Sequence, residues 1–203
     1  MMRSNLKFDD FDLSLKEYAK VNHVPIILDE GLSFLINIIK SSKAKNILEV
    51  GAAIGYSSIN MVKRSNAKVT TIERDDLMYN EAIKNIKLAN LEDKIKILHM
   101  DALEAFDEVK DNKFDLVFID AAKAQYQKFF ETYEKLLNPN GIIICDNMNF
   151  HMLKEKDQTE LSRSVRGLVR KLASFEAWLL SNDNYDTTIY DIGDGLSISI
   201  RKD

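Results

Sequence analysis

Residues 46–57, with the sequence NILEVGAAIGYS, decide the fold class of this chain. The first five are mostly apolar and end in valine, which is typical of a buried strand. Gly51 and Gly55 follow, and glycine lets a backbone turn tightly and approach a ligand closely. Residues 56–64 then have the spacing of a helix. The stretch therefore predicts a strand, a tight turn that can face a ligand, and a helix.

The same alternation continues towards the C-terminus. Further strands are expected at residues 67–73, 95–99, 114–120 and 142–145. Helices are expected at residues 76–89, 103–109, 126–137 and 161–179, with a turn at 138–141. The runs 186–190 and 196–200 flank a Gly-Asp-Gly turn and predict a hairpin. Repeated strand–helix units predict an α/β, doubly wound, mostly parallel seven-stranded sheet with an antiparallel C-terminal hairpin strand.

Two helices are expected before the first strand, at residues 11–22 and 28–39. Pro25 lies between them and disfavours helix at Val24. The chain of 203 residues, 45% of them hydrophobic, is long enough for one sizeable core. We therefore expect a single domain over residues 1–203, with N-terminal helices in 1–42 and the doubly wound core in 43–203.

The composition indicates a soluble globular protein with a net charge of -4. Cys145 is the only cysteine in the sequence, so a disulfide framework is excluded, as suits a reducing cytoplasm. The apolar runs are too short to span a bilayer, and no signal-like core follows the N-terminus. We expect a cytoplasmic protein that does not bind a membrane.

Ligands of doubly wound sheets bind outside the carboxyl ends of the strands. Glu49, Gly51 and Ser57 surround the end of the first strand, and Glu73 ends the second. An acidic side chain at that place can accept hydrogen bonds from both ribose hydroxyls. The G-x-G-x-x-G pattern of dinucleotide sites is absent, which favours a nucleoside cofactor without phosphates, such as S-adenosylmethionine. The alternative is a glycine turn that serves only helix–strand packing.

Two further strand ends support a cofactor site. Asp101 follows the third strand and could accept a hydrogen bond from the adenine amino group, with the Ala102 backbone nearby. Asp120 ends the fourth strand, where a carboxylate would face the cationic cofactor. Either aspartate could instead cap the helix that follows it.

Asp120 also belongs to a possible metal site. Asp146 and Asn147 end the fifth strand, which should neighbour the fourth. Two carboxylates repel each other unless a proton or a cation lies between them, and oxygen ligands favour Mg²⁺, or else Mn²⁺ or Ca²⁺. Lys123 could act there as a general base or stabilise negative charge. A helix cap, a turn and a surface lysine are the structural alternatives.

Residues 154–171 are basic within an acidic chain, with six basic and three acidic side chains. Such a segment can mark an anionic partner or form a solvated helix face. The residues that could contact an anionic substrate are Lys154, Arg163, Arg166 and Arg170.

Five stretches together resemble one known family. They are LEVGAAIGYS at 48–57, TIE at 71–73, FIDAAK at 118–123, DN at 146–147 and IGDGL at 192–196. Their order and spacing resemble the metal-dependent O-methyltransferases related to catechol and caffeoyl-CoA O-methyltransferases, which have a Rossmann-like fold. The resemblance covers nearly the whole chain.

The resemblance implies a role for each matching residue. Metal ligands would be Asp120, Asp146 and Asn147, and Lys123 would be the base. Contacts to S-adenosylmethionine would come from Ser57, Glu73, Asp101, Ala102 and Asp120, with Val24 near its methionine end. The N-terminal helices would form a homodimer contact.

Residues 23–26, 177–179 and 185–197 resemble most the bacterial branch that methylates 5-hydroxyuridine in tRNA. A departure follows Asn147, where MNFHM at 148–152 replaces the common Val-Leu-Phe/Trp-x-Gly. This loop should flank the acceptor pocket. The leading hypothesis is therefore a tRNA 5-hydroxyuridine O-methyltransferase. The alternatives are an enzyme for small catechol-like phenols and a non-catalytic nucleoside-binding module.

Overall fold

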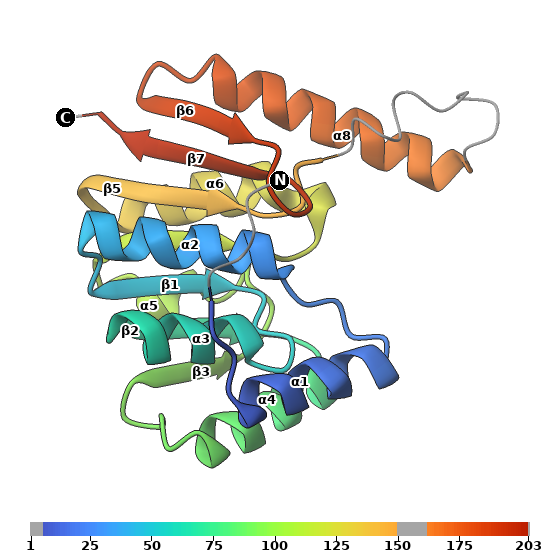
Figure 1. Ribbon diagram of the computed structural model, residues 1–203. Coiled ribbons are helices and arrows are strands. Elements are labelled where there is room, and N and C mark those ends of the chain that lie inside the picture. The colour runs from blue at the N-terminus through green and yellow to red at the C-terminus, as the bar shows by residue number, and fades with distance from the viewer. Residues whose placement is uncertain (1–5, 150–161, 203) are drawn as a thin grey trace.

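One seven-stranded sheet organises the protein, in the order β3-β2-β1-β4-β5-β7-β6. The structure is a computed structural model, and it describes residues 6–149 and 162–202. The strands are β1 (Asn46–Val50), β2 (Lys68–Glu73), β3 (Ile95–His99), β4 (Phe114–Ile119), β5 (Leu137–Cys145), β6 (Tyr185–Tyr190) and β7 (Leu196–Arg201). The first five pair in parallel, and β7 is antiparallel to both β5 and β6. The predicted doubly wound sheet with an antiparallel hairpin strand is confirmed (Figure 1).

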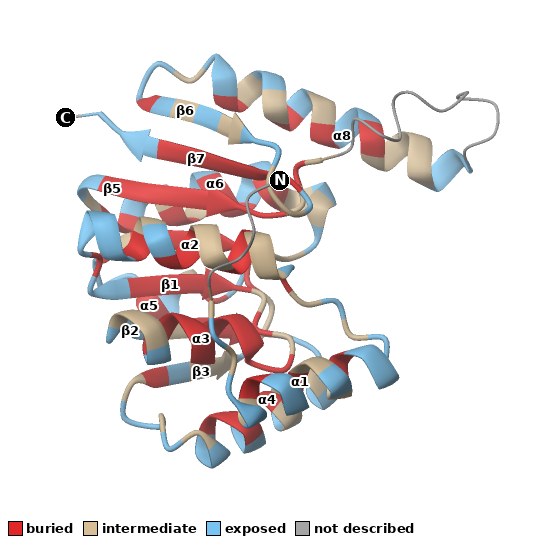
Figure 2. Cartoon of the chain, viewed as in Figure 1, coloured by how far each residue is buried: buried red, intermediate tan, exposed pale blue. Residues whose placement is uncertain are grey.

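Helices cover both faces of the sheet, so the central strands are almost completely buried (Figure 2). One core lies beneath α1 (Asp10–Val21), α2 (Asp29–Ser42), α3 (Tyr56–Ser65) and α4 (Asp76–Leu88). The other lies beneath α5 (Phe106–Val109), α6 (Tyr126–Tyr133) and α8 (Arg163–Leu180). Within the described part of the chain, no helix has both the length and the apolar character to cross a membrane.

The connection between β4 and β5 differs from the prediction. The expected helix at 126–137 ends at Tyr133, and the short 3₁₀ helix η2 (Glu134–Leu136) leads directly into β5. The expected turn at 138–141 lies within β5, because the pairing of β4 and β5 shifts register there. A hydrogen bond of 2.7 Å from Asn138 to Asp115 supports this irregular start of the strand.

The helix expected at 103–109 is also shorter and covers only Phe106–Val109. Asp101 explains the difference, because it organises the preceding residues as a turn. Its carboxylate accepts a hydrogen bond from the Leu103 amide at 2.9 Å, and its carbonyl accepts from Glu104 and Ala105.

Buried charge fastens α1 to α3. The Asp12 side chain is 1% exposed and forms ion pairs with Lys63 at 2.9 Å and Arg64 at 2.8 Å. Asp9 and Asp12 also form a capping box at the start of α1. This contact fixes α1 and thereby the segment after it, which returns over the carboxyl ends of the strands.

The backbone of Gly51, just after β1, lies very close to the backbone of Asp120, just after β4. The φ of Gly51 is +100°, and an added Cβ would lie 2.0 Å from the carbonyl oxygen of Asp120. No side chain fits at this position. By contrast, a Cβ at Gly167 in α8 would meet nothing within 4 Å.

Gly51→Ala is therefore expected to lower the free energy of unfolding by about 2–4 kcal/mol, through backbone strain and overlap. Gly167→Ala is expected to raise it by about 0.5–1 kcal/mol, because alanine suits a helix interior better than glycine. Urea denaturation of both variants measures this contrast. An unchanged unfolding midpoint for Gly51→Ala would contradict the close approach.

Candidate active site

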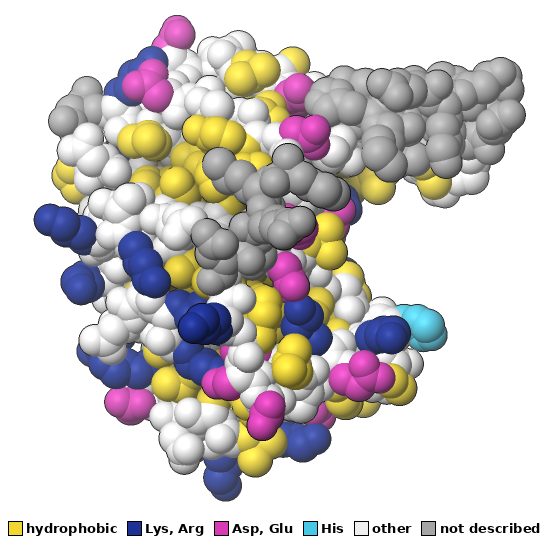
Figure 3. Space-filling model, viewed as in Figure 1, with side chains coloured by type: hydrophobic (Ala, Val, Ile, Leu, Met, Phe, Trp, Pro, Cys, Tyr) yellow, Lys and Arg dark blue, Asp and Glu magenta, His cyan; other side chains and the backbone are white. Residues whose placement is uncertain are grey.

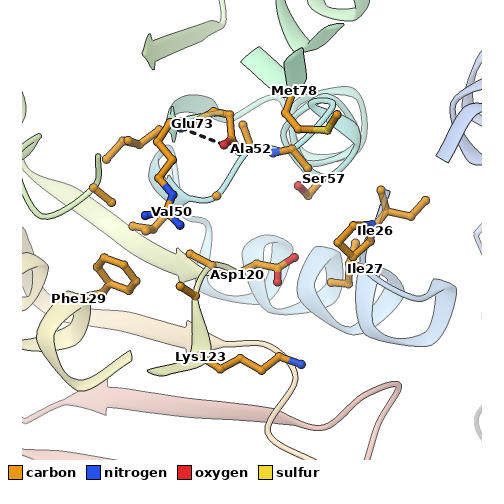
Figure 4. A pocket seen from close by; sticks show the side chains of 18 of the residues that line it. Ile26, Ile27, Val50, Ala52, Ser57, Glu73, Met78, Asp120, Lys123 and Phe129 are labelled. Carbon is orange, nitrogen blue, oxygen red and sulfur yellow. Dashed lines mark hydrogen bonds between the residues drawn. The ribbon is translucent and has the colours of Figure 1, made fainter. Parts of the chain in front are cut away.

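A cavity of about 400 Å³ opens at the carboxyl ends of the parallel strands. Its walls come from residues 24–27, 50–53, 56–57, 72–74, 100–102 and 120–123, together with Met78, Gln125, Phe129 and Asn147. Figure 4 shows Ser57 and Glu73 on one side of the space, and Asp120 and Lys123 on the other. The size is typical of small-molecule sites. Most residues predicted from the strand ends therefore share one cavity.

Glu73 is held in place at the end of β2 by three backbone amides. One carboxylate oxygen accepts from Ala53 at 2.8 Å, and the other accepts from Arg74 and Asp75 at 2.9 Å each. These bonds join β2 to the glycine-containing loop after β1. They fix the Glu73 carboxylate on the cavity wall, where the sequence predicted an acceptor for the ribose hydroxyls of the cofactor.

Glu49 does not line this cavity, although it was predicted as a cofactor residue. Its side chain is fully buried, and one oxygen accepts hydrogen bonds from Ser58 and from Thr71, the latter at 2.6 Å. Its other oxygen has no hydrogen-bond partner among the described residues. Burial raises the pKa of Glu49, and hydrogen bonds from hydroxyl groups oppose this. In this structure Glu49 supports the loop and α3 from below the cavity surface.

Asp101 and Ala102 follow β3 and line the cavity. The Tyr133 hydroxyl donates a hydrogen bond to the Ala102 carbonyl, and Tyr133 is fully buried. With Asp101 already bonded to Leu103, the backbone of this strand end is fixed on both sides. A nucleobase would therefore meet a preorganised edge.

Asp120 and Asp146 follow paired residues of the neighbouring strands β4 and β5. Asp146 is 2% exposed, and its amide donates to the Ile119 carbonyl at 3.1 Å. Burial raises the pKa of Asp120, and the charges of Asp146 and Glu49 raise it further. Burial also raises the pKa of Asp146, while Lys123 lowers the pKa of both aspartates. The predicted pair of mutually repelling carboxylates is thus brought together.

Asn147 adopts a left-handed backbone with φ of 58°, which asparagine tolerates better than most residues. Its amide donates to Asp146 Oδ1 at 2.7 Å, and the residue lies on the cavity wall. The buried Tyr126 hydroxyl donates to the Asp146 carbonyl at 2.9 Å. The strand end is therefore locally strained and firmly held, as often at functional sites.

Asp194, in the turn between β6 and β7, is an acidic neighbour that the sequence analysis missed. Its charge raises the pKa of both Asp120 and Asp146. Its carbonyl accepts a hydrogen bond from the Asn149 amide at 2.7 Å, which ties the turn to the segment after Asn147. The Gly-Asp-Gly pattern had indicated only a hairpin turn. The acidic residue within that turn was the feature from which its place near the strand ends could have been predicted.

The donor chemistry of Asp120, Asp146 and Asn147 suits a hard cation that prefers oxygen. Among residues 6–149 and 162–202 there is no group of three His, Cys, Asp or Glu side chains placed to hold a metal. The predicted set contains two carboxylates and one amide, so further positions would fall to water or to substrate oxygens. The residues present fit a partly open site.

The basic residues of α8 lie outside the cavity wall. Arg163 and Arg170 are exposed, Arg166 is partly buried, and Lys154 lies outside the described residues. The amino-terminal half of α8 projects past the carboxyl edge of the sheet (Figure 1). Phe175 anchors the helix against Tyr126 with ring centroids 5.7 Å apart. The helix that carries these arginines therefore extends beyond the carboxyl edge of the sheet, where the cavity opens.

The sheet order and the strand-end cavity define a Rossmann-like methyltransferase. Residues 12–202 match the family model described as O-methyltransferase. This chain belongs to that O-methyltransferase family.

Three known proteins are similar to this chain over most of their length. A catechol O-methyltransferase of Niastella koreensis is 32% identical over 179 residues, covering 83% of this chain and 79% of the relative. A Staphylococcus aureus crystal structure, provisionally assigned as a caffeoyl-CoA O-methyltransferase, is 40% identical with a TM-score of 0.90, covering 96% of this chain and 93% of that one. A Podospora anserina methyltransferase solved with SAH bound is 25% identical with a TM-score of 0.85, covering 97% and 89%.

Asp146→Asn should stabilise the metal-free protein at pH 8 by roughly 1–2 kcal/mol, because it removes a buried charge beside Asp120 and keeps an acceptor for the Asn147 amide. The folded-state pKa values of the two aspartates lie above the usual aspartate value of 3.8. The folded protein therefore binds more protons, and its stability falls as pH rises through those values.

Urea denaturation between pH 4 and pH 8, in chelator, measures this effect. The difference between variant and wild type should vanish near pH 4, where both aspartates are protonated. Asp183→Asn, at an exposed position, is the control. Parallel pH profiles for wild type and Asp146→Asn would contradict the proposed repulsion.

Proposed function

We propose that this protein transfers a methyl group from S-adenosylmethionine to the 5-hydroxyl of 5-hydroxyuridine in tRNA, with Mg²⁺ bound at the strand ends. The position of Asp120 carries the proposal. Its side chain lies on the wall of the cofactor-sized cavity and beside Asp146 of the next strand. One carboxylate therefore joins a nucleoside pocket to a set of metal donors.

Family membership supports S-adenosylmethionine as the methyl donor, as does the SAH bound to the Podospora relative. Glu73 would accept from the ribose and Asp101 from the adenine amino group. Ser57 and the segment at Val24 line the opposite end of the cavity, where the methionine part would lie. Asp120 would attract the cationic centre between these ends.

When bound, S-adenosylmethionine would supply the methyl group, and Mg²⁺ at Asp120, Asp146 and Asn147 would attract two adjacent acceptor oxygens. Figure 4 shows the Asp120 carboxylate and the Lys123 side chain extending in the same direction. Lys123 Nζ, as the uncharged amine, would take the proton of the acceptor hydroxyl. The oxygen–carbon bond would form as the sulfur–carbon bond breaks. Alignment by these residues can contribute about 7–11 kcal/mol at best.

The tRNA acceptor is supported by chemistry and by the position of α8. In 5-hydroxyuridine the hydroxyl and carbonyl oxygens are adjacent, as are the two oxygens of catechol. RNA bases that undergo such chemistry are usually single-stranded or flipped out. Arg163, Arg166 and Arg170 lie on the helix that projects past the cavity edge, where RNA phosphates would be held.

A small catechol-like phenol is the second candidate acceptor. The likeness to the Niastella koreensis catechol O-methyltransferase favours it. It would need the same metal donors but not the arginines of α8. A non-catalytic nucleoside-binding module is less consistent with family membership.

We also propose a homodimer formed through the N-terminal helices. Apolar side chains are exposed near α2 and the β6–β7 hairpin, including Leu28 at 45% and Ile200 at 43% (Figure 3). Phe34 of α2 contacts Tyr190 of β6 with ring centroids 4.9 Å apart. A self-associating surface would cover these side chains.

The decisive experiment incubates the protein with labelled S-adenosylmethionine, Mg²⁺ and tRNA from a strain that lacks this enzyme. Nucleoside analysis should show labelled 5-methoxyuridine. A parallel reaction contains catechol in place of tRNA. Label in catechol and none in tRNA would replace the tRNA proposal with the small-phenol one.

The control for the metal mechanism combines Asp146→Ala with Asn147→Ala. The double variant should lose methyl transfer to either acceptor, because the donors of two ligand positions are gone. Retained methyl transfer would contradict the metal mechanism. It would not change the conclusion about which acceptor receives the methyl group.

Replacing Arg163, Arg166 and Arg170 together by Ala should weaken tRNA binding and reduce its salt dependence, since each phosphate contact releases counterions. Catechol methylation should stay unchanged, because none of the three lines the cavity. Filter binding at several salt concentrations measures the effect. If the triple variant bound tRNA as tightly as the wild type, the proposed contact between α8 and RNA would be wrong.

A further inference from the structure

An ion pair lies at the adenosine end of the cavity. Arg74 Nη1 is 3.1 Å from Asp101 Oδ2, and both residues line the cavity. Arg74 is the residue directly after Glu73, so it starts from the end of β2 and reaches the end of β3. The pair therefore spans two neighbouring strand ends that the sequence analysis treated separately.

The other carboxylate oxygen of Asp101, Oδ1, already accepts a hydrogen bond within the protein. Oδ1 accepts the Leu103 amide at 2.9 Å and is held in the turn after β3. Oδ2 is thus the oxygen that can turn towards a ligand, and it is the oxygen that Arg74 contacts.

Arg74 is also tied to the ribose side of the cavity. Its backbone amide donates to Glu73 at 2.9 Å, and Glu73 is bonded in turn to Ala53 in the loop after β1. The apolar side chains of Met100 and Phe129 also line the cavity, and a purine ring could pack against them. One residue therefore links the predicted ribose acceptor to the predicted adenine acceptor.

We infer that Arg74 and Asp101 form a clasp at the adenosine end of the cavity, in which Arg74 directs Asp101 Oδ2 to the 6-amino group of adenine and so selects against 6-oxopurines. The inference rests on the proposed use of S-adenosylmethionine. Arg74 is a positioning residue, because it acts through Asp101.

Hydrogen-bond polarity gives the selection. A carboxylate accepts from the adenine amino group but repels the carbonyl oxygen of a 6-oxopurine. A site discriminates between ligands when the wrong ligand leaves polar groups of the site without a hydrogen-bond partner. Selection for adenine therefore depends on Asp101 Oδ2 keeping its position. Without Arg74, the Asp101 side chain can turn away from the purine, and the repulsion that weakens binding of a 6-oxopurine becomes smaller.

The expected size is modest, because the Arg74 side chain is 63% exposed and Asp101 is 32% exposed. Exposed ion pairs of this kind change binding by roughly three- to five-fold and weaken as salt rises. The clasp therefore adjusts cofactor selection and does not create the site.

Calorimetric titration with S-adenosylhomocysteine and with S-inosylhomocysteine, which carries a 6-oxo group, tests the clasp. No metal or acceptor is needed. Arg74→Ala should weaken S-adenosylhomocysteine binding about three- to five-fold and change S-inosylhomocysteine binding less. The preference for adenine should therefore fall about three-fold. Lys84→Ala, which breaks an exposed pair with Glu81 on α4, should change neither affinity.

Two results would overturn the clasp. One is an unchanged preference for adenine in Arg74→Ala, even if both ligands bind more weakly. The other is a wild-type preference that stays constant between low and high salt, since screening should open the pair. Failure of wild-type protein to bind S-adenosylhomocysteine would instead overturn the proposed methyl donor, and the clasp with it.

Discussion

The contact between the ends of β1 and β4 is the constraint on which the site depends. The Asp120 amide donates to the Val50 carbonyl at 2.9 Å, and Gly51 lies so close to the Asp120 carbonyl that a Cβ would meet it at 2.0 Å. The glycine-containing loop and the fourth strand end are therefore in direct backbone contact. Because of this contact, a single aspartate belongs to the cavity wall and also neighbours the fifth strand end.

Electrostatic repulsion is the consequence of that convergence. Glu49 and Asp146 are buried, and the partly buried Asp120 lies close to both. Asp194 adds a further negative charge, and the positive charge of Lys123 opposes these charges at the two aspartates. Buried carboxylates without enough positive charge destabilise a folded protein. A cation bound between these carboxylates would relieve this repulsion.

Local patterns predicted the strands and most site residues, because apolar periodicity and strand-end topology are both properties of short stretches. Glu49 shows the first limit. It lies opposite Thr71 within the sheet, so its side chain is enclosed by β2 and α3 and is kept from the cavity. The start of β5 shows the second limit, because the register shift against β4 arises from pairing between distant segments. Asp194 was missed for the same reason: its relation to β4 and β5 is purely tertiary.

The acceptor side of the site is built from different elements than the cofactor side. Met148 and Asn149 pair with the β6–β7 turn, and Gly195 must be glycine there because a Cβ would lie 2.4 Å from the Asn149 amide nitrogen. The backbone that leaves Asn147 is thus fastened to the hairpin at Met148 and Asn149, the first two residues of the stretch that departs from the common family pattern. Most of the residues proposed to hold the cofactor and the metal lie at or just after the carboxyl ends of the parallel strands. Under the proposed function, α8 would contribute to acceptor choice, whereas family membership defines only the reaction type, the transfer of a methyl group to oxygen.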